Sequence, residues 1–576
     1  MSIAAEEYLF TFGITLAFVG TIAAAYLSRR DIAAVFREAG FRRKHLYILL
    51  LVVFVFAAAE LAIVKPTQQL FFDDVIYQSM AQQLIHTGQA VMCNYGTPTS
   101  CFSAEVYHEP IGLPFNLAIG FIFFGISRAT AYGTIFVTAA LGVAMSFLLA
   151  FVLFKDEYAA LFTGLLMALS PIMLVWAMPT TSDMPMMAYA TMALLFTVIF
   201  AKRKRTGTFA LAAFSLGFLL YMKVDSFAYL LIAPLLYLAI DDRSLLRSLR
   251  SNAAILRRNF LNTKFLIVLL IFVIIVAPEV VYMYIELLTG NYGVTSTTYL
   301  QNTCNNMLPV QANGTFSFSN LNANICSNVA FWFNAYKSDY VMQPLIFTAL
   351  AILGAALLAY KRPRVLLFIG VWFVILFFIY VAFYAGGVLY GVDWRFMLAL
   401  IVQTSLLGGI ALSYIAKALM TPARIGMLPR RARTMMVYIA IAICIAIVVW
   451  PTYTLVPLLG VQPANIPQAN GARFYENFIY NSTASIPKSC IVMSYDPTFF
   501  NINGFAAAQL SGPNATSYRS FQNEYGCVVI DYGYWCSTPG NICSITTSGF
   551  NLATIKKVID PANGETFALY RITGVK

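Results

Sequence analysis

The stretch Ile48–Val64 reads ILLLVVFVFAAAELAIV, and Glu60 is its only charged residue. A helix needs about 20 mostly apolar residues to cross a bilayer. Similar runs recur along the chain, which is 60% hydrophobic and 11% charged, whereas a soluble chain carries roughly 25% charged residues. The first run, Tyr8–Leu27, follows two glutamates and not a basic segment, so it indicates a membrane anchor and not a cleaved signal peptide. The sequence therefore predicts an integral membrane protein.

The net charge of +12 does not indicate a nucleic-acid partner, because the basic residues are grouped between the apolar runs. Basic loops mark the cytoplasmic side of a membrane protein. Lys155 and five clusters hold 25 of the 37 Lys and Arg residues; the clusters are Arg29–Lys44, Lys202–Arg205, Arg243–Lys264, Lys361–Arg364 and Lys417–Arg433.

Twelve predicted spans place every basic cluster on one side of a cell membrane and both termini on the other. Residues 1–456 then form an α-helical transmembrane module with external loops at 65–128 and 286–340, and residues 457–576 form an external tail. The spans are 8–27, 46–64, 129–154, 158–177, 184–201, 208–222, 226–240, 265–285, 341–360, 365–385, 396–418 and 435–456.

The cysteines provide an independent argument for this topology. Cys444 lies inside a span, and the other eight all fall in segments assigned to the outside, where disulfides persist. Local spacing suggests one bridge in the first external loop, one in the second and two in the tail, with the tail connectivity open. The eight are Cys93, Cys101, Cys304, Cys326, Cys490, Cys527, Cys536 and Cys543.

The tail has a different composition, rich in Asn, Ser, Thr, Tyr and Gly. Three runs predict strands: Cys490–Tyr495, Cys527–Tyr532 and Thr566–Ile572. Asn551–Ile559 is interpreted as a helix. We expect a small α/β domain with disulfides on the outer membrane face.

The first external loop carries two adjacent carboxylates, Asp73 and Asp74, at the start of a predicted helix over Asp74–His86 that ends at Gly88. Ile76, Met80 and Leu84 follow the spacing of one apolar helix face, which predicts a helix lying flat at the membrane interface. An aspartate at this position can cap the helix, and the helix dipole stabilises its negative charge there. It can equally face a substrate, so both interpretations stay open.

Further along the loop, His108-Glu109-Pro110 predicts a turn into a short interfacial helix over Gly112–Ile126. Other ionisable residues lie at the external ends of predicted spans. Each charge near bilayer depth either extends to the interface or serves function. Cations beside paired carboxylates suit a phosphate-bearing substrate and a general base. The ionisable residues of this kind that matter for the site are Asp183, Lys223, Asp225 and Arg395.

These elements, in this order, resemble the GT-C glycosyltransferases, in particular the protein O-mannosyltransferase and aminoarabinose-transferase group. The resemblance covers about residues 46–420. The family's Asp-Glu pair is Asp-Asp here, and its Lys-Pro-Pro element is His-Glu-Pro. The matching elements are Asp73-Asp74-Val75-Ile76-Tyr77, Ala81, Leu84, Gly88, His108-Glu109-Pro110, Phe124-Gly125, Thr181-Ser182-Asp183-Met184-Pro185, Lys223-Val224-Asp225 and Asp393-Trp394-Arg395-Phe396.

The resemblance implies a sugar transfer from a polyprenyl-phosphate donor to a protein or glycolipid acceptor outside the cytoplasm, with inversion. It implies that Asp73 is the general base and that Asp74 orients the acceptor or caps the helix. Lys223 and Arg395 would bind the donor phosphate. The implied substrate-binding residues are Tyr77, His108, Glu109, Asp183 and Asp225. No cofactor is required, although His108 and Glu109 suit an optional divalent cation.

Two other classes of function fit parts of the sequence. A transporter or lipid flippase shares the number of helices and the charges near the membrane, although it would more often show internal repeats and helices broken at the midplane. A non-catalytic scaffold or receptor would not need paired aspartates beside cations.

Overall fold

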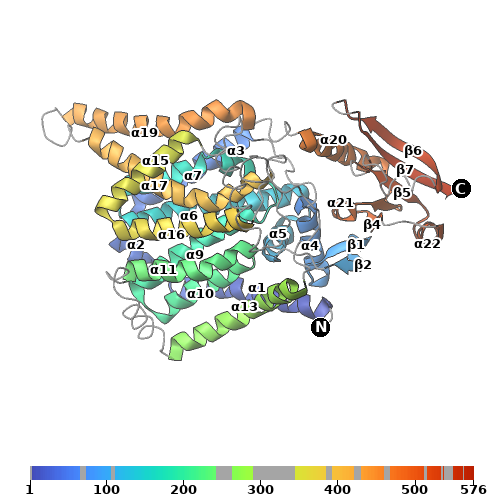
Figure 1. Cartoon of the computed structure of the whole chain (residues 1–576), viewed down its shortest axis with the longest axis horizontal. Coiled ribbons are helices and arrows are strands. Elements are labelled where there is room, and N and C mark those ends of the chain that lie inside the picture. The colour runs from blue at the N-terminus through green and yellow to red at the C-terminus, as the bar shows by residue number, and fades with distance from the viewer. Residues whose placement is uncertain are drawn as a thin grey trace.

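The computed structural model describes residues 3–64, 73–105, 110–241, 263–289, 344–383, 392–420, 430–459, 467–510, 515–533, 536, 549–561 and 564–576. A helical bundle occupies one side of the molecule and a β-sheet with short helices the other (Figure 1). In the bundle, two short 3-10 helices, η1 (Val224–Ala228) and η3 (Val392–Met397), lie between longer α-helices. The α-helices before and within the bundle are α1 (Ile3–Leu27), α2 (Arg29–Glu38), α3 (Arg43–Ile63), α4 (Asp73–Thr87), α5 (Gly112–Phe124), α6 (Arg128–Phe154), α7 (Glu157–Ala168), α8 (Pro171–Trp176), α9 (Asp183–Arg203), α10 (Thr206–Leu220), α11 (Tyr229–Asp241), α13 (Thr263–Thr289), α15 (Leu345–Lys361), α16 (Pro363–Phe383), α17 (Leu398–Leu419) and α19 (Arg430–Leu459).

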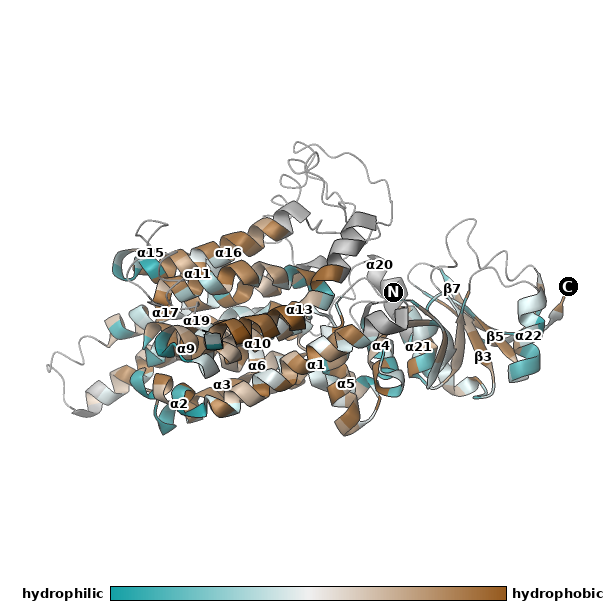
Figure 2. Cartoon of the chain, turned by 90° about the horizontal axis from the view of Figure 1, so that it is seen from below, coloured by the Kyte–Doolittle hydropathy of each residue, from teal (hydrophilic) through white to brown (hydrophobic). Residues whose placement is uncertain are grey.

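Seven helices in the described ranges are long and apolar enough to cross a membrane, and six shorter helices are also apolar. The predicted span 158–177 is two helices, α7 and α8, because Ser170-Pro171 interrupts the backbone hydrogen bonding. The hydrophobic residues concentrate on the bundle, and hydrophilic residues gather at helix ends (Figure 2). The stretch quoted first lies in α3, which buries a single stripe: His45, Leu49, Val52, Phe56 and Glu60.

Ion pairs join the helices at the end of the bundle away from the sheet. Glu157 lies 2.5 Å from Lys44 and 2.9 Å from His45. Arg203 lies 2.6 Å from Glu38, and Lys417 is paired with Asp156. The charges come from basic segments that the sequence predicts on a common side, and the structure places these four pairs between neighbouring helices.

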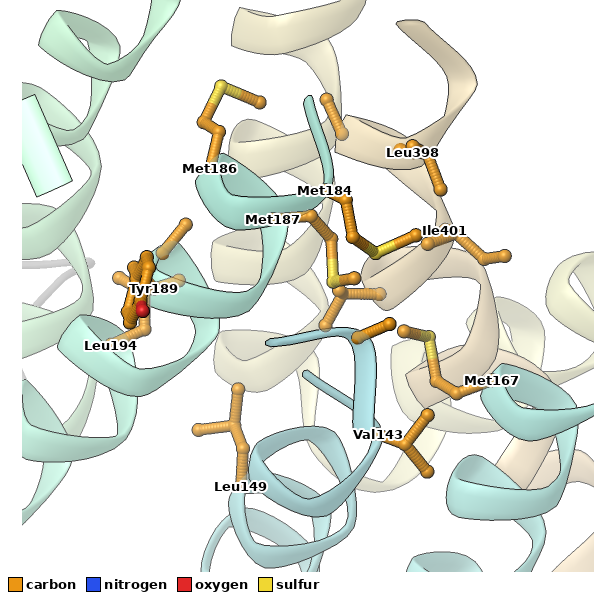
Figure 3. Packing of buried hydrophobic residues seen from close by; sticks show 14 of the residues in the cluster. Val143, Leu149, Met167, Met184, Met186, Met187, Tyr189, Leu194, Leu398 and Ile401 are labelled. Carbon is orange, nitrogen blue, oxygen red and sulfur yellow. The ribbon is translucent and has the colours of Figure 1, made fainter. Parts of the chain in front are cut away.

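The centre of the bundle is formed by α6, α7, α9 and α17 (Figure 3). Methionines from α7 and α9 meet Val143 of α6 and Leu398 and Ile401 of α17. Gly409 lets α17 approach α7 closely, since a Cβ atom there would lie 2.2 Å from the Thr163 hydroxyl. This packing fixes the first turn of α9, which carries part of the site described below.

A seven-stranded sheet joins residues 92–105 to the tail. Its order is β2-β1-β4-β3-β5-β7-β6, with β1 and β4 antiparallel, β3 parallel to both β4 and β5, and β7 antiparallel to β5 and β6. The strands are β1 (Met92–Thr97), β2 (Ser100–Glu105), β3 (Ile491–Ser494), β4 (Ala506–Gln509), β5 (Val528–Tyr532), β6 (Phe550–Ile559) and β7 (Thr566–Val575). The helices of this part are α20 (Pro467–Ser482), α21 (Pro497–Ile502) and α22 (Ala515–Tyr525), with the 3-10 turn η4 (Thr483–Ser485).

The three strands predicted in the tail are present as β3, β5 and β7, but the predicted helix Asn551–Ile559 is wrong. That segment is β6, and it pairs along its whole length with β7. The tail also does not stand alone, because β1 and β2 come from residues 92–105. The sheet therefore crosses the predicted boundary near residue 457.

Among the described residues, the disulfides with both partners placed are Cys93–Cys101 between β1 and β2 and Cys490–Cys527 beside β3 and β5. Cys536 is also disulfide-bonded. Cys304, Cys326 and Cys543 lie outside the described residues. Cys444 is a free, buried cysteine, as the sequence indicates.

Candidate active site

Helix α4 begins at Asp73, one residue before the predicted start, and ends before Gly88, whose φ of +78° suits glycine at a helix end. The predicted flat position at the membrane interface stays a prediction, and the apolar face of the helix packs against protein. Ile76, Met80 and Leu84 are buried, and so are the polar residues Gln78 and Gln83. The helix is enclosed because the bundle covers one side and α21 packs on the other.

The carboxylate of Asp74 is fixed inside the protein. Asp74 has no exposed surface, and the Thr180 hydroxyl lies 2.9 Å from its Oδ1 and 2.9 Å from its backbone oxygen. Gln78, one turn further along α4, donates from Nε2 to the Thr180 oxygen at 3.2 Å. Asp74 therefore does more than begin a helix, since it is bonded to a segment about 100 residues away. For Asp73 the backbone is described and the side chain is outside the described part.

Four charged side chains form a buried ion cluster: Asp183, Lys223, Asp225 and Arg395. Lys223 Nζ lies 2.8 Å from Asp183 Oδ1 and 3.0 Å from Asp225 Oδ2. Arg395 Nε lies 3.3 Å from Asp183 Oδ2. Removing one member of such a cluster would leave its partner as an uncompensated buried charge. The sequence names these four residues separately, and the structure brings them together.

The two cations of the cluster differ in exposure. The side chain of Lys223 is 3% exposed and that of Arg395 is 17% exposed. The ring of Phe396 lies 4.4 Å from Lys223 Nζ and 5.2 Å from Arg395 Cζ, so one aromatic face borders both. Arg395 is thus the cation of the cluster that a ligand reaches more easily.

One short segment connects the cluster to Asp74. Thr180 binds Asp74 and Asp183 binds Lys223, and the residues from Thr180 to Asp183 are all buried. Three residue steps span at most about 10 Å of extended chain. Thr180 was not singled out from the sequence, because its partner Asp74 is distant along the chain. The only feature of the sequence that could have indicated Thr180 is its position next to the Thr181-Ser182-Asp183 element.

Glycine at position 112 fixes the other side of the cluster. Gly112 N–H donates to the Tyr221 carbonyl at 2.7 Å, two residues before Lys223. A Cβ atom at Gly112 would lie 2.2 Å from that carbonyl oxygen, which leaves room for glycine alone. The Tyr221 hydroxyl donates to Ile275 O at 2.6 Å, so α5, α10 and α13 meet beside Lys223.

Tyr77, His108 and Glu109 are the other residues that were predicted to bind substrate. Tyr77 is buried, with 3% exposure, within the core around α4. His108 and Glu109 lie outside the described residues, so the optional cation stays a prediction. Within the described ranges, no group of three or more His, Cys, Asp or Glu side chains is arranged to hold a metal ion.

A second buried polar cluster lies at the carboxyl ends of β3 and β5. Asp531 Oδ2 accepts hydrogen bonds from the Tyr475 hydroxyl and, at 2.8 Å, from the Ser494 hydroxyl. Burial raises the pKa of Asp531 to about 7, and it raises the pKa of nearby Asp496 to about 6. Val75 of α4 belongs to the apolar cluster on this face of the sheet, which also contains Tyr475.

Three solved structures have a fold similar to that of this chain. ArnT from Cupriavidus metallidurans in the apo state matches with a TM-score of 0.51 and 13% identity, over 93% of this chain and 98% of ArnT. The same protein bound to undecaprenyl phosphate matches with a TM-score of 0.50 and 13% identity, over 92% of this chain and 98% of ArnT. AglB from Archaeoglobus fulgidus, in complex with an inhibitory peptide and a dolichol-phosphate, matches with a TM-score of 0.50 and 13% identity, over 92% of this chain and 74% of AglB.

The chain therefore has the fold of the GT-C membrane glycosyltransferases. The family model described as dolichyl-phosphate-mannose-protein mannosyltransferase matches residues 108–282, which include Asp183, Lys223 and Asp225. No curated protein sequence matches the chain. The resemblance inferred from the motifs is confirmed at the level of the GT-C class.

Proposed function

We propose that this protein transfers a sugar from a polyprenyl-phosphate donor to an acceptor at the extracytoplasmic face of the membrane. The observation that carries the proposal is the segment Thr180–Asp183, which joins the Asp74 carboxylate to the buried ion cluster. Two structures with the same fold hold undecaprenyl phosphate or dolichol-phosphate. A donor carried by a lipid approaches such a site from the bilayer. Nucleotide sugars are not available at the extracytoplasmic face, so a lipid-borne donor is required there.

The reaction requires one base and one binding site for an anion. Asp73 removes the proton of the acceptor hydroxyl, and the acceptor oxygen attacks the anomeric carbon. The bond between that carbon and the phosphate oxygen breaks, and the polyprenyl phosphate leaves with the electron pair. Attack opposite the leaving group inverts the anomeric centre. A general base contributes about 10²–10⁴-fold to such a step.

Arg395 is the residue that we assign to the donor phosphate. Its guanidinium borders the cluster and is more exposed than the Lys223 ammonium. A fixed positive charge stabilises negative charge that develops on the leaving group. Lys223, held between Asp183 and Asp225, supports Arg395 through Asp183, which both cations contact.

The other residues have supporting roles in this proposal. Asp74, bonded to Thr180, keeps the start of α4 in place so that Asp73 faces the acceptor. Asp183 and Asp225 orient the cations, and Tyr77 is buried one turn after the two aspartates on the same helix. His108 and Glu109 complete the acceptor side or bind an optional divalent cation.

The decisive experiment incubates the purified protein with a radiolabelled polyprenyl-phosphate sugar in detergent or liposomes. Wild-type protein is expected to release polyprenyl phosphate and transfer or hydrolyse the sugar. Asp73→Asn is expected to reduce turnover by about 10²–10⁴-fold while keeping its thermal stability. Normal turnover by Asp73→Asn would remove the proposed base. Movement of intact donor across the bilayer without cleavage would instead establish a flippase.

A further inference from the structure

The three parallel strands of the tail form a topological switch point. The order β4-β3-β5 places β3, the first of the three along the chain, between the other two. Helix α21 follows β3 and packs on one face of the sheet through Phe500, whereas α22 precedes β5 and packs on the other face through Tyr518. In open sheets of this kind, ligands bind outside the carboxyl ends of the strands at the switch point. A ligand of the tail is therefore expected at the carboxyl ends of β3 and β5.

Two aspartates lie at these carboxyl ends, Asp496 two residues after β3 and Asp531 near the end of β5. Ser494 joins them, because its hydroxyl donates to Asp531 Oδ2 at 2.8 Å and accepts from the Asp496 backbone N–H at 3.1 Å. The Thr498 hydroxyl donates to Asp496 Oδ1. Each of these four residues is 6% exposed or less. Two carboxylates and two hydroxyls thus gather inside one edge of the sheet.

One carboxylate oxygen of this group is buried without a hydrogen-bond donor. Asp531 has no exposed surface, and its Oδ2 accepts from Tyr475 and Ser494. Its Oδ1 has no hydrogen-bond partner in the described part of the chain. No Lys, Arg or His of the described residues is ion-paired with either aspartate. A buried carboxylate without such compensation is costly, so Asp531 Oδ1 is available to a ligand.

The chemistry of these groups favours one kind of ligand. Carboxylate and hydroxyl oxygens bind hard divalent cations, and Mg²⁺ is commonly held by only one or two carboxylates. Both aspartates would repel an anion, and an organic ligand needs a cleft, which residues buried this deeply do not offer. A proton on Asp531 Oδ1 would neutralise one carboxylate but find no acceptor. A cation instead bonds to oxygens of both aspartates.

We propose that Asp496 and Asp531 bind a divalent cation of the Ca²⁺ or Mg²⁺ class at the carboxyl ends of β3 and β5. Asp531 Oδ1 and a carboxylate oxygen of Asp496 are its direct ligands. Ser494 and Thr498 orient the two carboxylates. The cation joins β5 to the start of α21, which packs on α4, and so holds the tail on the helix that carries Asp73. This site is separate from the proposed sugar transfer and does not depend on it.

The test uses the purified full-length protein in detergent, freed of metal with EDTA and dialysed into buffer at pH 8, above the raised pKa values of both carboxyl groups. CaCl₂ and MgCl₂ are titrated separately by isothermal calorimetry. We expect a dissociation constant of about 10⁻⁴–10⁻³ M for the preferred ion, as in weak extracellular calcium modules. At about 10 mM of that ion, the melting temperature of the tail should rise by about 5 °C relative to EDTA. Hydrogen exchange should slow at residues 494–498 and 531–532, which locates the ion.

Asp531→Asn and Asp496→Asn each remove one charged ligand. Either variant should weaken binding by about tenfold or more and abolish the rise in melting temperature. Glu524→Gln is the matched control, because Glu524 is an exposed carboxylate on α22, at the other face of the sheet. This control should bind the ion as tightly as the wild-type protein. Hydrogen exchange on the wild-type protein decides the matter if both aspartate variants fail to fold.

Four results would overturn the proposed site. The first is no binding of either ion, with unchanged exchange at residues 494–498 and 531–532. The second is equal affinity in the wild-type protein and in folded aspartate variants. The third is an equal rise in melting temperature with NaCl at matched ionic strength, which indicates an adventitious ion only. The fourth is binding that survives in both aspartate variants and is lost in His108→Ala, which would assign the ion to the optional site in the first loop.

Discussion

The helical bundle and the seven-stranded sheet are held together by different interactions. In the bundle, apolar helix faces pack together, including pairs distant in sequence such as α7 with α17 and α1 with α10, and the site is held by charges placed at helix ends. In the sheet, strands β1 and β2 of the first loop join strands that begin some 390 residues later, at β3. We therefore expect a change at the exposed cation of the bundle site to affect the chemistry with little loss of stability, and changes in the sheet to affect stability with little loss of chemistry.

The strongest test of this contrast is Arg395→Gln in the bundle site. The variant removes the more exposed cation, and we expect kcat to fall by about 10²–10³-fold, as when a group that stabilises developing negative charge is lost. The folded structure should persist, because the side chain lies at the border of the cluster. Transfer kinetics and thermal unfolding of the same preparation would measure both effects.

Lys223→Met provides the contrasting variant within the same cluster. It leaves Asp183 and Asp225 buried without their shared cation, and breaking a buried pair in this way destabilises by about 3–5 kcal/mol. We expect poor folding or a large fall in melting temperature. A stable Lys223→Met protein with normal donor affinity would show that the cluster has a minor role.

In the sheet, replacing Cys490 and Cys527 by serine should mainly affect stability. Their disulfide closes a loop with a sequence separation of 37 residues, and removing such a bridge costs about 2–4 kcal/mol. We expect local unfolding or proteolysis of the tail at lower temperature, with donor cleavage retained at low temperature. Limited proteolysis followed by the transfer assay would check this. Loss of donor cleavage in protein whose tail is still folded would contradict the contrast between the two regions.

Gly112→Ala tests the contact between α5 and the end of α10, within the bundle. The added Cβ would overlap the Tyr221 carbonyl, and overpacking of this kind costs about 1–3 kcal/mol. Gly133→Ala is the control, since a Cβ there meets no atom within 4 Å and alanine favours the helix. Only the change at residue 112 should lower the melting temperature. The same variant should also bind the donor less tightly.

The smallest expected effect concerns pH and the Asp531 cluster. The pKa of Asp531 is raised from 3.8 to about 7 by burial, so the folded sheet favours the neutral carboxyl group. The stability from this group is complete below pH ~4 and is lost as the pH rises through about 7. Burial also raises the pKa of Asp496, to about 6, so the contribution of Asp496 to stability likewise falls as the pH rises.

The sheet should therefore melt at a higher temperature at pH 5 than at pH 8. Asp531→Asn should remove part of this difference and raise the melting temperature at pH 8, because the amide has no charge to bury. Circular dichroism melts of the two proteins at both pH values would measure the effect. Identical pH dependence in the variant would exclude Asp531 as its source.

The sequence predicted best what depends on local pattern. Helix α4 and its end at Gly88 follow from spacing within 15 residues, and long apolar runs predicted α3 and α6. The four residues of the ion cluster were all recognised, because charges next to apolar runs are conspicuous. Their mutual contacts depend on three separate helix ends and could not be derived from spacing.

Features that depend on distant segments were missed. The segment Asn551–Ile559 was predicted as a helix, and it is a strand because β7 lies beside it. The bond from Thr180 to Asp74 and the pairing of β1 with β4 both join residues more than 100 positions apart.

The pairing of β1 with β4 also has a consequence for biosynthesis. A ribosome that adds about 5–20 residues per second completes the β1–β2 hairpin roughly 20–80 seconds before it makes β4, some 400 residues later. During that interval both edges of the hairpin are without a neighbour while the later helices enter the membrane. The Cys93–Cys101 bridge joins the two strands of the hairpin, so an oxidising compartment can stabilise it before its partner strand emerges.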